Sequence, residues 1–145
     1  MTLTFDGTIV VPVGDPDDGE KTAAALAPRM EPGSRAVVVY VIEKAGGAPD
    51  KTSVEQSELY AEDVFAAARG PLEGSSAAVE TDARYGTDVV ETIFDAAEDR
   101  EADCVVFVPR ESNRLVELLT GDASRKLVKE GSVPVVSLPQ NGSRE

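Results

Sequence analysis

Hydrophobic residues follow two alternating patterns along this chain. Short runs of β-branched and apolar residues, such as residues 8–13 and 36–42, are typical of strands covered on both faces of a parallel sheet. Between such runs, apolar residues recur at steps of three and four, the spacing of one helix face. The predicted strands are residues 8–13, 36–42, 77–84, 104–108 and 133–138, and the predicted helices are residues 19–30, 53–68, 88–99 and a last one that opens at Gly121.

This alternation predicts one α/β domain over residues 1–145, with a five-stranded parallel sheet and helices on both faces. Residues 77–84 alternate apolar with charged side chains, so we expect them to form a half-exposed edge strand. The terminal residues 1–5 and 140–145 are predicted to be flexible ends. In folds of this kind, ligands bind beyond the carboxyl ends of the strands, here after the first and fourth strands.

Capping and turn residues set the expected bounds of the helices. Asp17 with Glu20 resembles a capping box for the first helix, and Ser53 with Gln56 is an N-cap signature for the second. Thr87 is placed to cap the third helix.

Turn signals complete the predicted boundaries. We expect Gly70–Pro71 to end the second helix, residues 85–87 to form a turn, and residues 115–119 to form a short apolar turn. Pro12 lacks a backbone donor, so it is expected near the end of the first strand.

The composition limits the chemistry open to the chain. It has no His, which excludes a Ser–His or Cys–His nucleophile, and no spacing of residues indicates a metal site. Its single cysteine, Cys104, lies in a predicted buried strand, where the interpretation as an inert apolar residue is favoured over a redox role. Tyr40, Tyr60 and Tyr85 are expected to be packing residues, because no basic stripe accompanies them as in a base-stacking platform.

The net charge is −13, with 27 acidic against 14 basic residues. Such a surface repels nucleic acid and anionic lipid, so neither is an expected partner. The even spread of acidic residues is typical of a protein adapted to a salt-rich cytosol, the alternative being an ordinary acidic mesophilic protein. No apolar run reaches the roughly 18 residues of a membrane span, and residues 1–6 do not resemble a signal peptide, so we expect a cytoplasmic protein.

Five segments in order resemble those of universal stress protein domains. They are Val11–Val13 before a Gly/Asp turn, Val39–Ile42, Tyr85–Asp88, Ala102–Val106 and Val133–Val136. The resemblance covers nearly the whole chain. It implies a Rossmann-like sheet of the adenine nucleotide alpha hydrolase type, with strand order 3-2-1-4-5.

The resemblance also implies a homodimer that pairs through the fifth strand. An apolar edge strand needs covering, so the pattern of residues 133–138 agrees with this expectation. The expected dimer residues are Val133, Pro134, Val135, Val136, Ser137 and Leu138.

ATP-binding members carry Gly-x2-Gly-x9-Gly-Ser/Thr after the fourth strand. The matching positions here are Val108, Glu111, Gly121 and Asp122, so one glycine of the three is kept. Side chains at Val108 and Glu111 obstruct close approach of phosphate to backbone, and Glu111 adds a repelling charge. Ionised Asp122 cannot donate to phosphate as a hydroxyl does, and it can itself accept the free N–H groups of a helix N-terminus.

The loop after the first strand is acidic, like the segment after the fourth strand. Gly14 occupies the position of a usual adenine-pocket Asp, although a one-residue shift would place Asp15 there. After the fourth strand there are two cations, Arg110 and Arg114, which either favour an anion or pair with neighbouring carboxylates. After the first strand, the acidic residues 15–18 either cap a helix or hold a divalent cation. The resemblance assigns the nucleotide pocket to Val13, Gly14, Asp15, Val41, Val108, Pro109, Arg110, Glu111, Gly121 and Asp122.

The sequence therefore predicts a homodimeric, non-enzymatic stress-response module that binds no cofactor tightly and has no catalytic residues. The alternative is a member that binds ATP with Mg²⁺, or AMP, and turns it over slowly or not at all.

Overall fold

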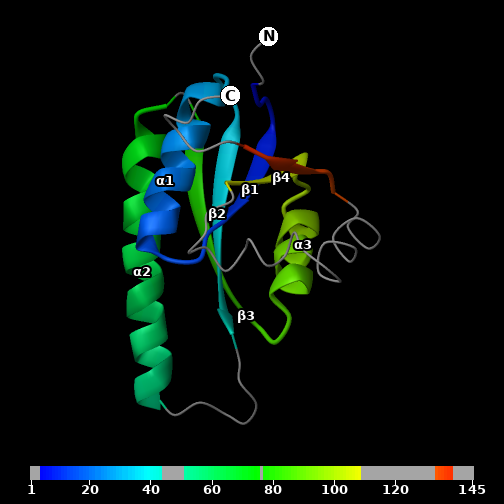
Figure 1. Cartoon of the computed structure of the whole chain (residues 1–145). Helices are drawn as coiled ribbons and strands as arrows, with labels where there is room; N and C mark the ends of the chain where they lie inside the picture. Colours follow the sequence, from blue (N-terminus) through cyan, green and yellow to red (C-terminus); the bar gives the residue numbers. More distant parts are fainter. Residues whose placement is uncertain (1–3, 44–50, 76, 109–132, 139–145) are drawn as a thin grey trace.

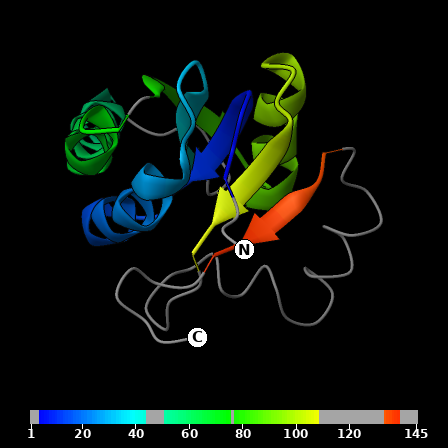
Figure 2. The same cartoon turned by 90° about the horizontal axis from the view of Figure 1, so that it is seen from above.

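Five parallel strands form the centre of the structure, a computed structural model that describes residues 4–43, 51–75, 77–108 and 133–138. The strand order is β3-β2-β1-β4-β5, which confirms the predicted fold class. Helices α1 and α2 cover one face of the sheet and α3 covers the other (Figures 1 and 2). The elements are β1 (Thr8–Pro12), α1 (Pro16–Leu26), η1 (Ala27–Arg29), β2 (Arg35–Glu43), α2 (Lys51–Glu73), β3 (Ala78–Gly86), α3 (Val89–Asp99), β4 (Cys104–Phe107) and β5 (Val135–Ser137).

Alternate side chains of the central strands supply two apolar cores. Ile9 and Val11 of β1 pack beneath α1 and α2 with Leu26, whereas Val10 packs beneath α3 with Phe94. Both faces of β1 are therefore buried, which explains its continuous apolar sequence. Pro12 is the last residue of β1, as predicted.

Helix α1 begins earlier than predicted. Its first residue is Pro16, and Asp15 is the N-cap, with the Asp18 N–H donating to Asp15 Oδ1 at 2.7 Å. The expected start near residue 19 and the capping box of Asp17 with Glu20 were therefore wrong. Proline is favoured in the first turn because its missing N–H has no helical partner there.

Helix α2 is longer than predicted at both ends. It begins at Lys51, so Ser53 lies inside the helix and is not its N-cap. Pro71 also lies inside it, although we expected Gly70–Pro71 to end the helix. Leu72 follows the proline and is completely buried in the core beneath α1 and α2. Its burial stabilises the last turn and opposes the break that a proline favours.

The boundary between β3 and α3 also differs from the prediction. Tyr85 and Gly86 belong to β3 and pair with Ile42 and Glu43 of β2, so they are not part of a turn. The N-cap of α3 is Asp88, whose Oδ1 accepts the Glu91 N–H at 3.1 Å, and not Thr87. β3 lies at one edge of the sheet, as its alternating pattern predicted.

The terminal segments show one further difference. Phe5, within the segment predicted to be a flexible end, is buried and forms a β-bridge with Met30. β4 ends at Phe107 and β5 spans only Val135–Ser137, so both are shorter than expected. The predicted turn at residues 115–119 and the helix opening at Gly121 lie outside the described residues. Within the described ranges, no helix combines the length and apolar character needed to span a membrane.

Candidate functional site

The carboxyl ends of β1 and β4 lie side by side in the middle of the sheet. Beyond β1, the Val13 N–H donates to the Val39 carbonyl of β2 at 3.0 Å, which fixes the start of the β1–α1 loop. Beyond β4, Val108 is completely buried in the same core as Val13 and Leu138. The Val108 side chain therefore fills core space at a point where a glycine would leave the backbone uncovered.

Asp18 is a completely buried carboxylate in the first turn of α1. Its Oδ2 accepts the Gly14 N–H at 2.7 Å, and its Oδ1 accepts the Thr22 hydroxyl at 3.1 Å. Charged acceptors near a helix N-terminus are stabilised by the free N–H groups and by the helix dipole. Asp18 therefore ties the β1–α1 loop to the helix that follows it.

Asp15 completes this arrangement from the other side of the turn. Its side chain caps α1 through the Asp18 N–H, and its carbonyl accepts the Gly19 N–H at 2.8 Å. Two carboxylates of the chain itself thus accept backbone N–H groups of this corner. In the described residues, the half-buried Asp15 and the exposed Asp17 place negative charge at this corner, which disfavours a phosphate there.

The sequence interpretation missed Asp18 as a buried residue. It treated residues 15–18 as one acidic loop that either caps a helix or holds a divalent cation, and did not distinguish the exposed Asp17 from the buried Asp18. The available signal was spacing, because Asp15 and Asp18 stand three residues apart like the two members of a capping box, and Thr22 follows one turn later.

β5 forms the second edge of the sheet. It pairs with β4 over three residues, and the Val105 N–H also donates to the Pro134 carbonyl at 2.8 Å. Val135 and Val136 are half-buried and Ser137 is exposed. Among the described elements, nothing pairs with the outer side of β5.

Comparison with protein families identifies the chain. Residues 7–139 match the model of the universal stress protein family. The chain belongs to the universal stress protein family. No curated protein gives a significant match.

Solved structures of universal stress proteins share this fold. UspA from Lactobacillus plantarum is 22% identical with a TM-score of 0.63, over 91% of this chain and 97% of that one. A universal stress protein from Archaeoglobus fulgidus is 20% identical with a TM-score of 0.59, over 92% and 94%. An Arabidopsis thaliana family member with AMP bound is 14% identical with a TM-score of 0.60, over 94% and 93%. At these identities the likeness shows the fold.

The structure places half of the predicted pocket residues of this universal stress protein. Val13, Gly14 and Asp15 lie together at the β1–α1 corner, and Val108 shares a core with Val13. Val41 packs against the other core, beneath α3. The remaining predicted positions, and Arg114, lie outside the described residues; they are Pro109, Arg110, Glu111, Gly121 and Asp122.

Charged side chains of β3 form a network with the end of α3. Glu80, Asp82 and Arg84 alternate along β3 and therefore share one face of the strand. In the network, arginines and carboxylates alternate in the order Arg35, Glu80, Arg100, Asp82, Arg84 and Asp99, with N–O distances from 2.5 to 3.4 Å. Equal numbers of both charges make the network neutral in a strongly acidic protein.

The described residues include neither a cluster of metal-binding side chains nor an exposed cysteine. Within them, no group of three or more His, Cys, Asp or Glu side chains is arranged to hold a metal ion. Cys104 is buried, and desolvation, with a smaller effect of the Asp103 charge, raises the pKa of its thiol to about 11. The thiolate is the reactive form, so this cysteine is poorly suited to redox chemistry at neutral pH.

Proposed function

We propose that this universal stress protein is a homodimeric, non-enzymatic regulatory module that acts through protein contacts and does not bind ATP tightly. The observation that carries the proposal is the buried Asp18 carboxylate, which accepts the Gly14 N–H at the corner beside the strand ends. A ligand phosphate placed there would find the Gly14 N–H already bonded to Asp18 and would face the negative charge of Asp15 and Asp17.

The sequence after β4 supports the same proposal. Val108 occupies the first glycine position of the family's ATP motif, and its side chain is completely buried in the core. Glu111 and Asp122 replace the second glycine and the hydroxyl of that motif. Together these three changes add bulk and negative charge where a triphosphate needs glycine backbone and donors.

Nucleotide binding without rapid hydrolysis is the second candidate function. It is favoured by family members of the same fold whose structures are described as complexes with dAMP, cAMP and AMP. A nucleoside monophosphate places fewer charges near the strand ends than ATP with Mg²⁺ does. The two candidates therefore differ most in their affinity for the triphosphate.

The deciding experiment combines nucleotide release with titration. Protein purified in molar KCl is denatured and its supernatant assayed for nucleotide, and the folded protein is titrated with ATP and Mg²⁺ and with AMP by calorimetry. We expect no carried nucleotide and no measurable heat with ATP. Carried nucleotide at one per chain, or micromolar ATP binding, would contradict the proposal.

A double variant tests whether the substitutions cause the loss. Glu111→Gly with Asp122→Ser restores two motif positions, and we expect it to create or strengthen ATP binding. The matched control is Glu91→Gln with Asp95→Asn at two exposed positions of α3, which removes the same number of negative charges outside the motif. Equal ATP binding by both variants would show that general charge and not the motif is responsible.

The dimer part of the proposal rests on the β5 edge. Val135 and Val136 are half-buried and β5 lies at the edge of the sheet, which favours pairing with a second copy of the strand. Ser137→Glu places like charges across such a pair, so we expect it to shift the dimer to monomer in light scattering. Ala83→Glu, at an exposed position on the opposite edge strand β3, is the control and should leave the mass unchanged.

A further inference from the structure

The sheet face beneath α3 changes from apolar to charged at its edge. Val37 and Val39 of β2 belong to the apolar core under α3, whereas no residue of β3 belongs to it among the described residues. On the same face, the middle of β3 carries three charged residues, which are Glu80, Asp82 and Arg84. Charge therefore takes the place of apolar packing where the end of α3 approaches the edge strand.

The ionic contacts converge on the carboxyl end of α3. Arg100, the C-cap of the helix, contacts Glu80 at 2.5 Å and Asp82 at 3.4 Å, measured between nitrogen and oxygen atoms. Asp99, the last residue of the helix, accepts a hydrogen bond from Arg84 at 2.7 Å. We call Glu80, Asp82, Arg84, Asp99 and Arg100 the α3 latch, because they join the end of this helix to β3.

The helix end that the α3 latch holds is unfavourable by itself. Glu98 and Asp99 place carboxylates in the last turn, where the helix dipole favours positive charge, and this turn contains no basic residue. Glu101, which follows the C-cap, has a φ of 52°, a left-handed conformation that is costly for a residue other than glycine. The N–H groups of Arg100, Glu101 and Ala102 close the end by donating to carbonyls of α3. The α3 latch therefore opposes two destabilising features.

Salt acts on the α3 latch and on the whole chain in opposite directions. Three of its side chains are substantially exposed, namely those of Asp99 (64%), Glu80 (38%) and Arg100 (30%). Their attractions weaken as the Debye length falls from ~10 Å in 0.1 M salt to ~3 Å in 1 M salt. The same screening relieves repulsion within a chain of net charge −13. Rising salt therefore lowers the free energy of opening this end while it raises the free energy of unfolding the chain.

We propose that the α3 latch is a salt-sensitive device, which releases the carboxyl end of α3 from β3 as salt rises while the rest of the fold becomes more stable. Opening uncovers Ala96 and Ala97, which are completely buried in the core beneath α3. The surface beside the β3 edge thus changes with salinity. The inference is independent of nucleotide binding, because no residue of the α3 latch is among the predicted pocket residues.

The experiment is hydrogen exchange of single backbone amides, followed by NMR in ~0.1 M and ~2 M KCl. The amides of Arg100 and Ala102 report on the α3 latch, and the amide of the buried Val38, which pairs with both β1 and β3, reports on global unfolding. Protection factors are taken relative to unstructured peptides in the same salt. From low to high salt, we expect protection of the two latch amides to fall about threefold to tenfold and protection of Val38 to rise.

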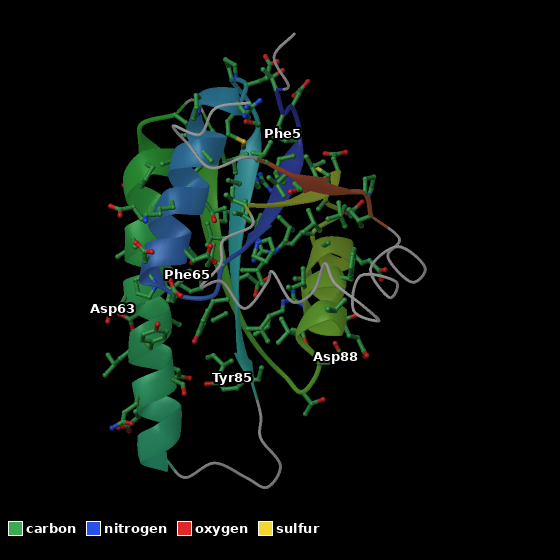
Figure 3. All side chains as sticks on the ribbon, viewed as in Figure 1. Phe5, Asp63, Phe65, Tyr85 and Asp88 are labelled. Atoms are coloured by element: carbon green, nitrogen blue, oxygen red, sulfur yellow. The ribbon has the colours of Figure 1, made fainter. Side chains whose placement is uncertain are left out.

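Variants separate the α3 latch from general acidity. Asp82→Asn removes the carboxylate that Arg84 and Arg100 share, so protection of the Arg100 and Ala102 amides should fall about fivefold at low salt and show a smaller further loss at high salt. Arg100→Gln is the second latch variant and should act in the same direction. The control, Asp63→Asn, removes an exposed charge on the outer side of α2, across the sheet (Figure 3), and should leave the salt response unchanged.

Glu101→Gly separates backbone strain from charge. Glycine adopts a φ near +50° without strain, so the Arg100 and Ala102 amides should be protected about fivefold more at both salt concentrations, with the same dependence on salt as in the parent. Glu101→Gln removes the charge and keeps the strain, so it should show no such gain.

The inference fails if the latch amides gain protection with KCl in parallel with Val38. It also fails if Asp82→Asn keeps the full salt response of the parent, or if Asp63→Asn alters that response as much as Asp82→Asn does. A fall in latch protection that is confined to chains with an intact α3 latch would support it.

Discussion

At the scale of single residues, Asp18 decides how the β1–α1 corner is built. Its carboxylate accepts from a backbone N–H before the helix and from a hydroxyl one turn later, both inside the protein. A buried acceptor of this kind costs free energy unless its donors are present, and here they are. The same group fixes the shape of the corner, whose accessible negative charge comes from Asp15 and Asp17.

Replacing Asp18 with Asn should lower the free energy of unfolding by about 1–2 kcal/mol, because the neutral amide loses the charge-assisted hydrogen bond from the Gly14 N–H and the stabilisation of a carboxylate by the helix N-terminus. The measurement is the denaturation midpoint in guanidinium chloride at constant slope. The matched control is Asp17→Asn. Asp17 precedes Asp18 in the sequence, is exposed and pairs with Lys21 at 3.7 Å, so its replacement should change the free energy of unfolding by no more than ~0.5 kcal/mol. Equal effects of both variants would contradict the role given to Asp18.

Cys104 gives a residue-scale prediction about pH. Its pKa is raised from an ordinary value near 9 to about 11 in the folded protein. The unfolded chain therefore loses the thiol proton first, so stability contributed by the buried thiol is complete below pH 9 and falls as pH rises from 9 toward 11. Cys104→Ala should show less loss of stability over this interval.

The same shift slows alkylation. A pKa of about 11 in place of 9 reduces the thiolate fraction of Cys104 about a hundredfold below pH 9. Iodoacetamide should therefore react with the native protein at least that much more slowly than with the protein in denaturant. A native rate close to the denatured rate would show that the Cys104 thiol is exposed and unshifted.

At the scale of elements, the charge network fixes α3 against the edge strand β3. Asp82 lies at its centre, with its side chain only 12% exposed, and contacts both Arg84 and Arg100. Removing the partner of a largely buried charge lowers the free energy of unfolding more than removing the partner of an exposed charge.

Arg84→Gln should therefore lower the free energy of unfolding by about 1–2 kcal/mol at low salt, because Asp82 loses its closest cation. Lys21→Gln, which breaks the exposed pair with Asp17, should cost no more than ~0.5 kcal/mol. Thermal or chemical unfolding of both variants decides this. An Arg84→Gln cost no larger than that of Lys21→Gln would mean that the network contributes little.

The elements also show where sequence patterns are informative. The alternation of apolar runs with helical periodicity predicted a parallel sheet with helices on both faces, because it reports which faces are buried, whereas the strand order followed from the resemblance to the family. Local signals were less reliable. Pro71 was expected to end α2, yet the burial of Leu72 extends the helix. The burial of Asp18 was missed, although its spacing from Asp15 and Thr22 was a local sign that it belongs to the helix N-terminus. The nucleotide positions after Val108 remain predictions.

At the scale of the whole molecule, the charge of −13 is the dominant electrostatic property. Repulsion among excess carboxylates opposes the compact state, and salt screens it. The network of β3 and α3 acts in the opposite direction, because screening weakens its attractions. Since that network is neutral and local, we expect the repulsion of the excess charge to determine the net effect.

Raising KCl from ~0.1 M to ~2 M should therefore increase the free energy of unfolding, as in a protein adapted to a salt-rich cytosol. The control is a triple variant, Glu55→Gln with Glu62→Gln and Asp95→Asn, at three exposed carboxylates. It should be more stable than the parent at low salt and gain less from KCl. Stability that does not rise with KCl would reject salt adaptation.

The two edges of the sheet are chemically unlike. β3 carries alternating charges that are paired with α3, whereas β5 presents valines and a serine. Polymerisation by strand pairing needs two adhesive edges on every molecule, one for each neighbour. In the proposed dimer, two copies joined at β5 would leave only their charged β3 edges uncovered, and growth would end at two copies. The difference between the edges is thus a built-in limit on filament formation, even at high protein concentration.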